Sequence, residues 1–300
     1  MLKIAWSPVY CHPLPVNHRF PMEKYNLLPQ QLRYEGLVGD DNFFEPEPLS
    51  KELILRTHKA SYWEKLDTLS LDRKEERKTG FPLSRNLIHR EVIIAQGTVD
   101  CTQHALKYGI SFNIAGGTHH AFADRGEGFC LLNDIAIAAN YLLDQGQANQ
   151  IMVIDLDVHQ GNGTASLFQS EPRVFTFSMH GAKNYPMHKE QSDRDIPLED
   201  GTGDPEYLST LREQLEELIP RVNPDFVFYQ SGVDVLATDK LGKLGLSIQG
   251  CRERDFLVLD ACRRKDIPIT AVMGGGYSQQ ISHIIEAHAN TYRLADELYF

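Results

Sequence analysis

The chain has 300 residues, of which 42% are hydrophobic, and this composition supports a substantial core and argues against a disordered chain. It carries 30 Lys and Arg against 41 Asp and Glu, which gives a net charge of −11. This charge opposes general attraction to nucleic acid or anionic membranes, and it suits a cationic substrate better than an anionic one. The five cysteines include no CxxC pair, which disfavours a disulfide framework or a thiolate zinc finger and favours a cytoplasmic protein, with the nucleus left open for a eukaryotic chain.

Strands and helices are predicted to alternate along most of the chain. Residues 1–10 predict a first strand, region 10–48 is rich in Pro and aromatic residues and is expected to be loop-like, and charged region 71–80 predicts a solvated loop or helix face. No segment reaches the roughly 18 apolar residues of a membrane span, and the first residues lack the apolar region of a leader.

The regular part of the pattern begins near residue 89. Its predicted strands are 111–116, 151–154, 173–180, 224–232 and 268–276, and its predicted helices are 89–108, 133–144, 205–219, 252–265 and one from about Ser278 onward. This alternation predicts an α/β fold, in which a mostly parallel sheet lies between two helical layers. With no linker or repeat in the chain, residues 1–300 are expected to form one domain.

The stretch IMVIDLDVHQGNGT, at 151–164, places charged residues directly after an apolar strand. Asp155, Asp157 and His159 occupy every second position, so in an extended chain their side chains share one face. Buried carboxylates are costly unless they are paired or bind a metal, and the stretch therefore indicates a metal site. The alternative is a strand that has simply ended, with these side chains solvated in the following turn.

Other polar groups also follow predicted strands. His119 and His120 follow 111–116, Asp234 follows 224–232, and Gly274, Gly275, Gly276 and Tyr277 follow the apolar run ITAVM. Ligands of open α/β sheets bind beyond the carboxyl ends of the strands, so these groups are expected to meet in one crevice.

Asp157, His159 and Asp234 offer two carboxylates and one imidazole, a set that binds a divalent cation and leaves coordination positions open. Zinc is the favoured metal, and Fe²⁺, Mn²⁺ and Co²⁺ remain open. Asp155, outside this set, is expected to fix the tautomer of a neighbouring histidine or to help hold a second ion.

The pair His119-His120 in GGTHHAF supplies imidazoles that titrate near neutrality and suits general acid and base catalysis, the alternative being one core and one surface histidine. Tyr277 can donate a hydrogen bond to an oxyanion, the alternative being a packing tyrosine in a strand-to-helix turn. The segment GEGFC, at 126–130, is either a simple turn or a place where Phe129 walls a narrow tunnel.

Five ordered motifs, GGTHHAF, GEGFCLLND, IDLDVHQGNGT, SGVD and MGGGY, resemble those of the zinc-dependent histone deacetylase family of the arginase/deacetylase fold. The similarity runs from about Trp6 to the C-terminus, and it is greatest to class IV deacetylases and their bacterial relatives. The related binuclear manganese enzymes are disfavoured, because Gly161 and Leu236 stand where carboxylates for a second metal are needed.

The resemblance implies hydrolysis of the amide of Nε-acyl-lysine in proteins or peptides, with acetylpolyamine hydrolysis or a non-catalytic metal-binding protein as alternatives. Asn162 stands where many members carry an aspartate behind the second histidine, and this neutral partner is expected to make that imidazole less basic. The roles implied for the site are Zn²⁺ on Asp157, His159 and Asp234; proton transfer by His119 and His120; oxyanion stabilisation by Tyr277; substrate contact by Gly128, Phe129, Gly275 and Gly276; and a structural K⁺ on Asp155, Ser178, Met179 and the backbone oxygens of Asp157 and His159.

Overall fold

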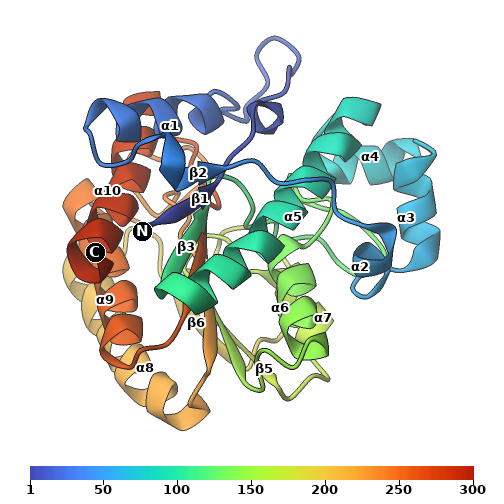
Figure 1. Ribbon diagram of the computed structural model, residues 1–300. Coiled ribbons are helices and arrows are strands. Elements are labelled where there is room, and N and C mark those ends of the chain that lie inside the picture. Colours follow the sequence, from blue (N-terminus) through green and yellow to red (C-terminus); the bar gives the residue numbers. More distant parts are fainter.

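An eight-stranded sheet, parallel throughout, forms the centre of the computed structural model, which describes all residues from Met1 to Phe300 (Figure 1). Its strand order is β2-β1-β3-β8-β7-β4-β5-β6. The strands are β1 (Lys3–Ala5), β2 (Phe43–Phe44), β3 (Ile110–Asn113), β4 (Ile151–Asp155), β5 (Val174–Gly181), β6 (Arg194–Leu198), β7 (Phe226–Gln230) and β8 (Ile269–Val272).

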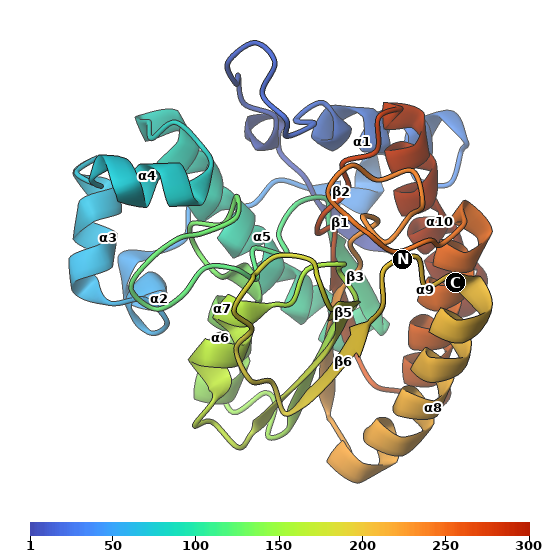
Figure 2. The ribbon, with the colours of Figure 1, turned by 180° about the vertical axis from the view of Figure 1, so that it is seen from behind.

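Helices cover both faces of the sheet, as Figures 1 and 2 show. On one side of the sheet, α1 packs on α10, α10 packs on α9, and α9 packs on α8. On the other side α5 packs on α6, α7 lies beside α6, and α2 to α4 lie further from the sheet. The bounds are α1 (Lys24–Tyr34), α2 (Lys51–Leu55), α3 (Ala60–Asp67), α4 (Arg73–Thr79), α5 (Arg85–Tyr108), α6 (Asp134–Asp144), α7 (Asn162–Phe168), α8 (Asp204–Val222), α9 (Ile248–Arg264) and α10 (Ile281–Tyr299), with short 3-10 turns at Pro8–Tyr10 and Asp40–Asn42.

The four central strands β3, β8, β7 and β4 are buried at every residue. Their apolar runs are typical of strands covered on both faces, so the predicted three-layer α/β/α fold is confirmed. Strand β4 pairs with β7 on one side and β5 on the other. The polar residues after β4 therefore emerge in the interior of the sheet's carboxyl edge.

The prediction of a loop-like region over 10–48 is wrong in part, because α1 and β2 lie within it. Helix α1 contains Pro29, which lowers the helical propensity of its sequence. Tyr25, Leu28 and Leu32 are buried, and the helix packs on α10. Tertiary packing thus stabilises a helix that the local sequence does not favour.

Several other elements were not predicted, namely α2, α3, α7 and the edge strand β6. Of the two structures predicted for residues 71–80, a loop or a helix face, the helix is the one observed. Asp72 caps α4 by accepting hydrogen bonds from the backbone amides of Lys74 and Glu75, and Gly80 ends the helix in the left-handed conformation. No helix is both long and apolar enough to span a membrane.

Candidate active site

The side chains of Asp157, His159 and Asp234 converge at the carboxyl edge of the sheet. One potential ligand atom from each lies within 4.8 Å of the others, and all three residues are buried. His159 Nδ1 is 3.0 Å from Asp157 Oδ1 and 3.1 Å from Asp234 Oδ2. The structure therefore brings together the three residues that the sequence predicts as metal ligands.

Backbone amides hold both carboxylates of this group. The amide of Gly275, after β8, donates to Asp157 Oδ2 at 2.8 Å, and the amide of Val158 donates to Asp234 Oδ1 at 2.9 Å. A side chain at position 275 would collide with Asp234, since a Cβ there would lie 2.0 Å from Oδ2. Glycine is thus required for the close approach of the two strand ends.

The buried charges of the group favour a cationic partner. Asp157 and Asp234 are 1% and 0% exposed, and burial together with the charge of Asp157 raises the pKa of Asp234 to about 7. Two buried carboxylates beside one imidazole form a donor set of two oxygens and one nitrogen, which suits a divalent cation. When such a cation binds, it replaces the proton that His159 would otherwise share with the two carboxylates. The residues present therefore fit a metal ion.

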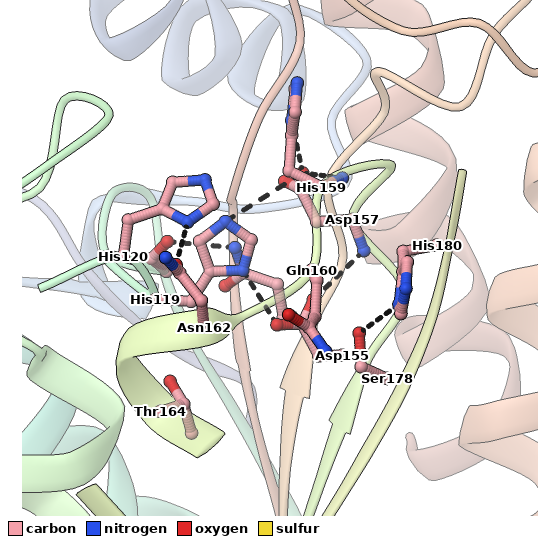
Figure 3. Close-up of polar contacts among 12 residues, drawn as sticks. His119, His120, Asp155, Asp157, His159, Gln160, Asn162, Thr164, Ser178 and His180 are labelled. Carbon is pink, nitrogen blue, oxygen red and sulfur yellow. Dashed lines mark hydrogen bonds and ion pairs between the residues drawn. The ribbon is translucent and has the colours of Figure 1, made fainter. Parts of the chain in front are cut away.

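His119 and His120 lie next to this group, each fixed by a different partner (Figure 3). His119 Nδ1 lies 2.7 Å from Asp155 Oδ2, and His120 Nδ1 lies 2.6 Å from Asn162 Oδ1. The ring centroids of the two histidines are 4.1 Å apart, and His119 Nε2 is 4.0 Å from Asp157 Oδ1. In both rings Nε2 is left for contact with a ligand.

Strand β4 ends at Asp155, so the strict alternation expected over residues 155–159 does not continue past the strand. Asp155 Oδ2 contacts His119 Nδ1, and Asp155 is not part of the group formed by Asp157, His159 and Asp234. Its other oxygen accepts the backbone amide of Asp157 at 3.2 Å.

Ser178 lies beside Asp155, because the two residues are register partners in β5 and β4. Its hydroxyl is 2.9 Å from His180 Nδ1 (Figure 3), and Met179 is fully buried. The residues predicted for a potassium site are thus adjacent at the carboxyl ends of two neighbouring strands.

Tyr277 closes the site from the end of β8. Its backbone amide donates to Asp239 Oδ2 at 2.6 Å, and its ring centroid lies 6.0 Å from that of Phe129 and 5.9 Å from that of Phe20. Gly276 precedes it with a φ of +155°, a backbone conformation that residues with a side chain rarely adopt.

A cavity of about 540 Å³ leads to these residues. The predicted catalytic and metal-binding residues in its lining are His119, His120, Asp157, His159 and Tyr277. Of the predicted substrate contacts, Gly128, Phe129 and Gly275 line the cavity. Gly276 and Asp234 are not part of the lining. Gly128 has a φ of +54° and lies against His120, since a Cβ there would be 2.6 Å from the ring.

Residues that were not predicted from the sequence also line the cavity. Tyr25 and Arg90 are among them, and Tyr185 packs edge-on against His120 with its hydroxyl 2.7 Å from Glu127 Oε2. Lys24 is fully buried nearby and donates to the carbonyl oxygen of Gly274 at 3.0 Å. No local sequence signal marks these residues, because long-range packing brings them to the site.

Comparison with known proteins agrees with this geometry. The profile of the histone deacetylase domain matches residues 18–292. An uncharacterized protein of Picosynechococcus sp. is 40% identical over 296 residues, which cover 99% of both chains, and histone deacetylase 2 of Arabidopsis thaliana is 29% identical over 277 residues, covering 89% of this chain and 72% of the relative.

A crystal structure of an HDAC homologue from Aquifex aeolicus superposes with a TM-score of 0.84 at 26% identity, covering 99% of this chain and 84% of that one. The resemblance and the enzyme class predicted from the motifs are thereby confirmed. The chain is a hydrolase of the deacetylase type and belongs to the histone deacetylase family.

Proposed function

We propose that the protein hydrolyses the amide of Nε-acyl-lysine in proteins or peptides, with one zinc ion held by Asp157, His159 and Asp234. The observation that carries this proposal is the position of two oriented histidines beside a buried O,O,N donor set, at a cavity that Phe129 and Tyr277 also line. This arrangement combines a site for a metal ion, two histidines that can transfer protons, and a channel that can accept a long side chain.

Zinc is favoured by the donor set and by the family to which the chain belongs. A zinc ion held there would supply Lewis acidity toward the acyl carbonyl and toward a water molecule. The backbone amides of Gly275 and Val158 orient the two carboxylates for this role.

His119 and His120 carry the proton in this proposal. They take it from the attacking water and return it to the leaving lysine amine, so that a neutral amine departs. Asp155 and Asn162 keep the two rings oriented through their Nδ1 atoms. Asn162 bears no charge and therefore supports His120 without the electrostatic contribution that Asp155 makes to His119.

Tyr277 donates its hydroxyl to the oxyanion that forms as the amide is attacked, a contact worth on the order of 3 kcal/mol in enzymes that stabilise such oxyanions. Gly128 and Phe129 contact the methylene groups of the acyl-lysine, and the backbone at Gly275 and Gly276 contacts its acyl end. These assignments are supported by the positions of Tyr277, Gly128, Phe129 and Gly275, which all line the cavity. Gly276 does not line it but directly precedes Tyr277.

A potassium ion at Asp155, Ser178, Met179 and the backbone oxygens of Asp157 and His159 belongs to the same proposal. Its support is the pairing of Asp155 with Ser178 across β4 and β5. Residues 1–300 form one catalytic domain in this proposal, which is supported by a continuous hydrophobic core that connects β1 to α10.

The test is a comparison of substrates with the purified zinc-loaded protein. A series of peptides that carry one lysine with acyl groups of increasing length should be hydrolysed, and N-acetylspermidine should be turned over with a much lower kcat/KM. A preference for N-acetylspermidine would favour a polyamine amidohydrolase, and zinc binding without hydrolysis of any acyl length would favour a non-catalytic protein.

A further inference from the structure

The mouth of the cavity is surrounded by basic side chains. Five cationic residues of the cavity lining are exposed: Arg19, Arg77, Lys78, Lys183 and Lys243. They come from four separate segments, namely the loop before α1, helix α4, the turn after β5 and the loop after β7. Helix α4 and the loop before α1 project from the same end of the molecule in both views of Figures 1 and 2.

This basic rim, as we call these five residues, is opposite in sign to the chain as a whole, whose net charge is −11. Glu127 is the only carboxylate of the lining apart from the metal-ligand Asp157. It is already engaged, since its oxygens lie 2.8 Å from Arg125 Nε, 2.7 Å from the Tyr185 hydroxyl and 3.6 Å from Lys78 Nζ. The rim therefore keeps a net positive charge.

Most of the rim cations are free to meet a ligand. Lys243 Nζ contacts only the carbonyl oxygen of Lys183, at 3.2 Å, and Arg77 forms no ion pair. Lys183 pairs with Glu199 at 3.3 Å, but both side chains are largely exposed, and such surface pairs are weak. These cations can exchange their present contacts for anionic groups of a substrate at little cost.

Arg19 shows where the rim stands relative to a substrate. Its guanidinium lies 5.0 Å from the centre of the Phe129 ring, so it covers the residue proposed to contact the lysine side chain. If the acyl end of that side chain reaches the metal-ligand group, the residues on either side of the lysine lie among the rim cations.

We infer that the basic rim selects acyl-lysine segments flanked by Asp and Glu over segments flanked by Lys and Arg. This inference rests on the proposed function and adds the substrate class: acidic protein segments rather than basic tails. The same local charge disfavours acetylpolyamines, which are cationic, although the charge of the whole chain alone would favour them. The rim acts on substrate choice and not on the chemistry of the amide.

The experiment uses three peptides that differ only in the residues flanking one acyl-lysine, which are Glu, Gln or Lys. At low ionic strength we expect kcat/KM for the Glu peptide to exceed that for the Lys peptide about tenfold, and this ratio should fall to about twofold near 0.5 M NaCl because exposed charges are screened. The double variant Lys183→Glu/Lys243→Glu should abolish or reverse the preference.

The matched control is Lys107→Glu/Lys265→Glu, which changes the net charge equally. Both residues are exposed and precede β3 and β8, so they lie at the amino edge of the sheet, away from the cavity. This variant should keep the wild-type ratio. Equal turnover of the Glu and Lys peptides, or an equal effect of the two double variants, would overturn the inference.

Binding measurements separate this inference from the proposed function. If the Gln peptide is not hydrolysed, the proposed function fails, and fluorescence anisotropy with labelled peptides then tests the rim alone. The Glu peptide should still bind about tenfold more tightly than the Lys peptide at low salt. Stronger competition by duplex DNA than by an acidic peptide without acyl-lysine would contradict a preference for protein segments.

Discussion

Asn162 Oδ1 lies 2.6 Å from His120 Nδ1 (Figure 3). An amide oxygen only accepts hydrogen bonds, so Nδ1 of His120 carries the proton and Nε2 presents a lone pair to the cavity. At His119 a carboxylate, that of Asp155, takes the equivalent position. The neighbouring imidazoles thus have the same orientation restraint but different electrostatic support.

This relationship predicts different effects for two substitutions of Asn162. Asn162→Leu removes the acceptor and should lower kcat about 10- to 100-fold, because the His120 ring loses its orientation. Asn162→Asp retains the acceptor and should keep kcat within about tenfold of the wild type. Steady-state kinetics on an acyl-lysine peptide, with thermal unfolding as the control for folding, distinguishes them, and a Leu variant with full activity would show that the contact has no catalytic role.

Tyr277→Phe removes one hydroxyl and leaves the ring packing intact. We expect kcat to fall about 100- to 1,000-fold with little change in KM, since the lost hydrogen bond exists mainly in the transition state. Tyr299→Phe, which removes a hydroxyl bonded to Leu259 far from the cavity, is the control and should leave kcat unchanged. Similar kinetics for both variants would contradict the oxyanion role.

Gly128 and Gly146 provide a matched pair for testing the contact with His120. Both have positive φ, +54° and +62°, so alanine at either position should cost about 1 kcal/mol of backbone strain. A Cβ at 128 would meet the His120 ring at 2.6 Å, whereas a Cβ at 146 would have no heavy atom within 4 Å.

Gly128→Ala should therefore displace His120 and lower kcat at least about tenfold, while Gly146→Ala should lower only the free energy of unfolding. Chemical denaturation and peptide kinetics on both variants give the comparison. Full activity in Gly128→Ala would mean that the position of the His120 ring is not critical.

The stability of the fold should depend on pH through His58. Its Nε2 accepts the backbone amide of Asn133 at 3.0 Å and its Nδ1 donates to the carbonyl oxygen of Phe122 at 2.9 Å, so the ring is neutral. Burial lowers the pKa of His58 to about 4, against about 6.5 in an unfolded chain. Between these two values only the unfolded state binds the proton, so the free energy of unfolding falls as the pH falls.

From pH 7 to pH 5 this one group should lower the free energy of unfolding by about 2 kcal/mol, and above about pH 7.5 it should have almost no further effect. Urea denaturation at several pH values measures the slope. His58→Gln, which keeps an acceptor and a donor but does not titrate, should lose about 2 kcal/mol less over this range. An identical pH dependence in the variant would show that His58 is not the responsible group.

The sequence was sufficient for the parts of the structure that depend on position along strands. The apolar run of β4 marks a buried strand, and Asp157, Asp234 and Tyr277 follow strands of one parallel sheet, so their convergence follows from topology. His119 is near Asp155 for the same reason.

The parts that could not be predicted depend on contacts between distant segments. Helix α1 contains Pro29 and is stabilised by packing on α10, and its buried Lys24 binds a carbonyl 250 residues away in the chain. The basic rim draws its cations from four segments whose local sequences show no common feature. The net charge of the chain, a sum over all residues, therefore gives the wrong sign for the mouth of the cavity.

The most direct test of the metal centre is a titration of metal-free protein with zinc while hydrolysis of an acyl-lysine peptide is followed. Activity should rise from zero and stop rising at one equivalent of zinc, and Asp234→Ala should neither gain activity nor retain zinc. Full activity in the metal-free protein, or an Asp234→Ala variant that binds zinc and turns over like the wild type, would contradict the assignment of Asp157, His159 and Asp234 as the ligands of a catalytic metal ion.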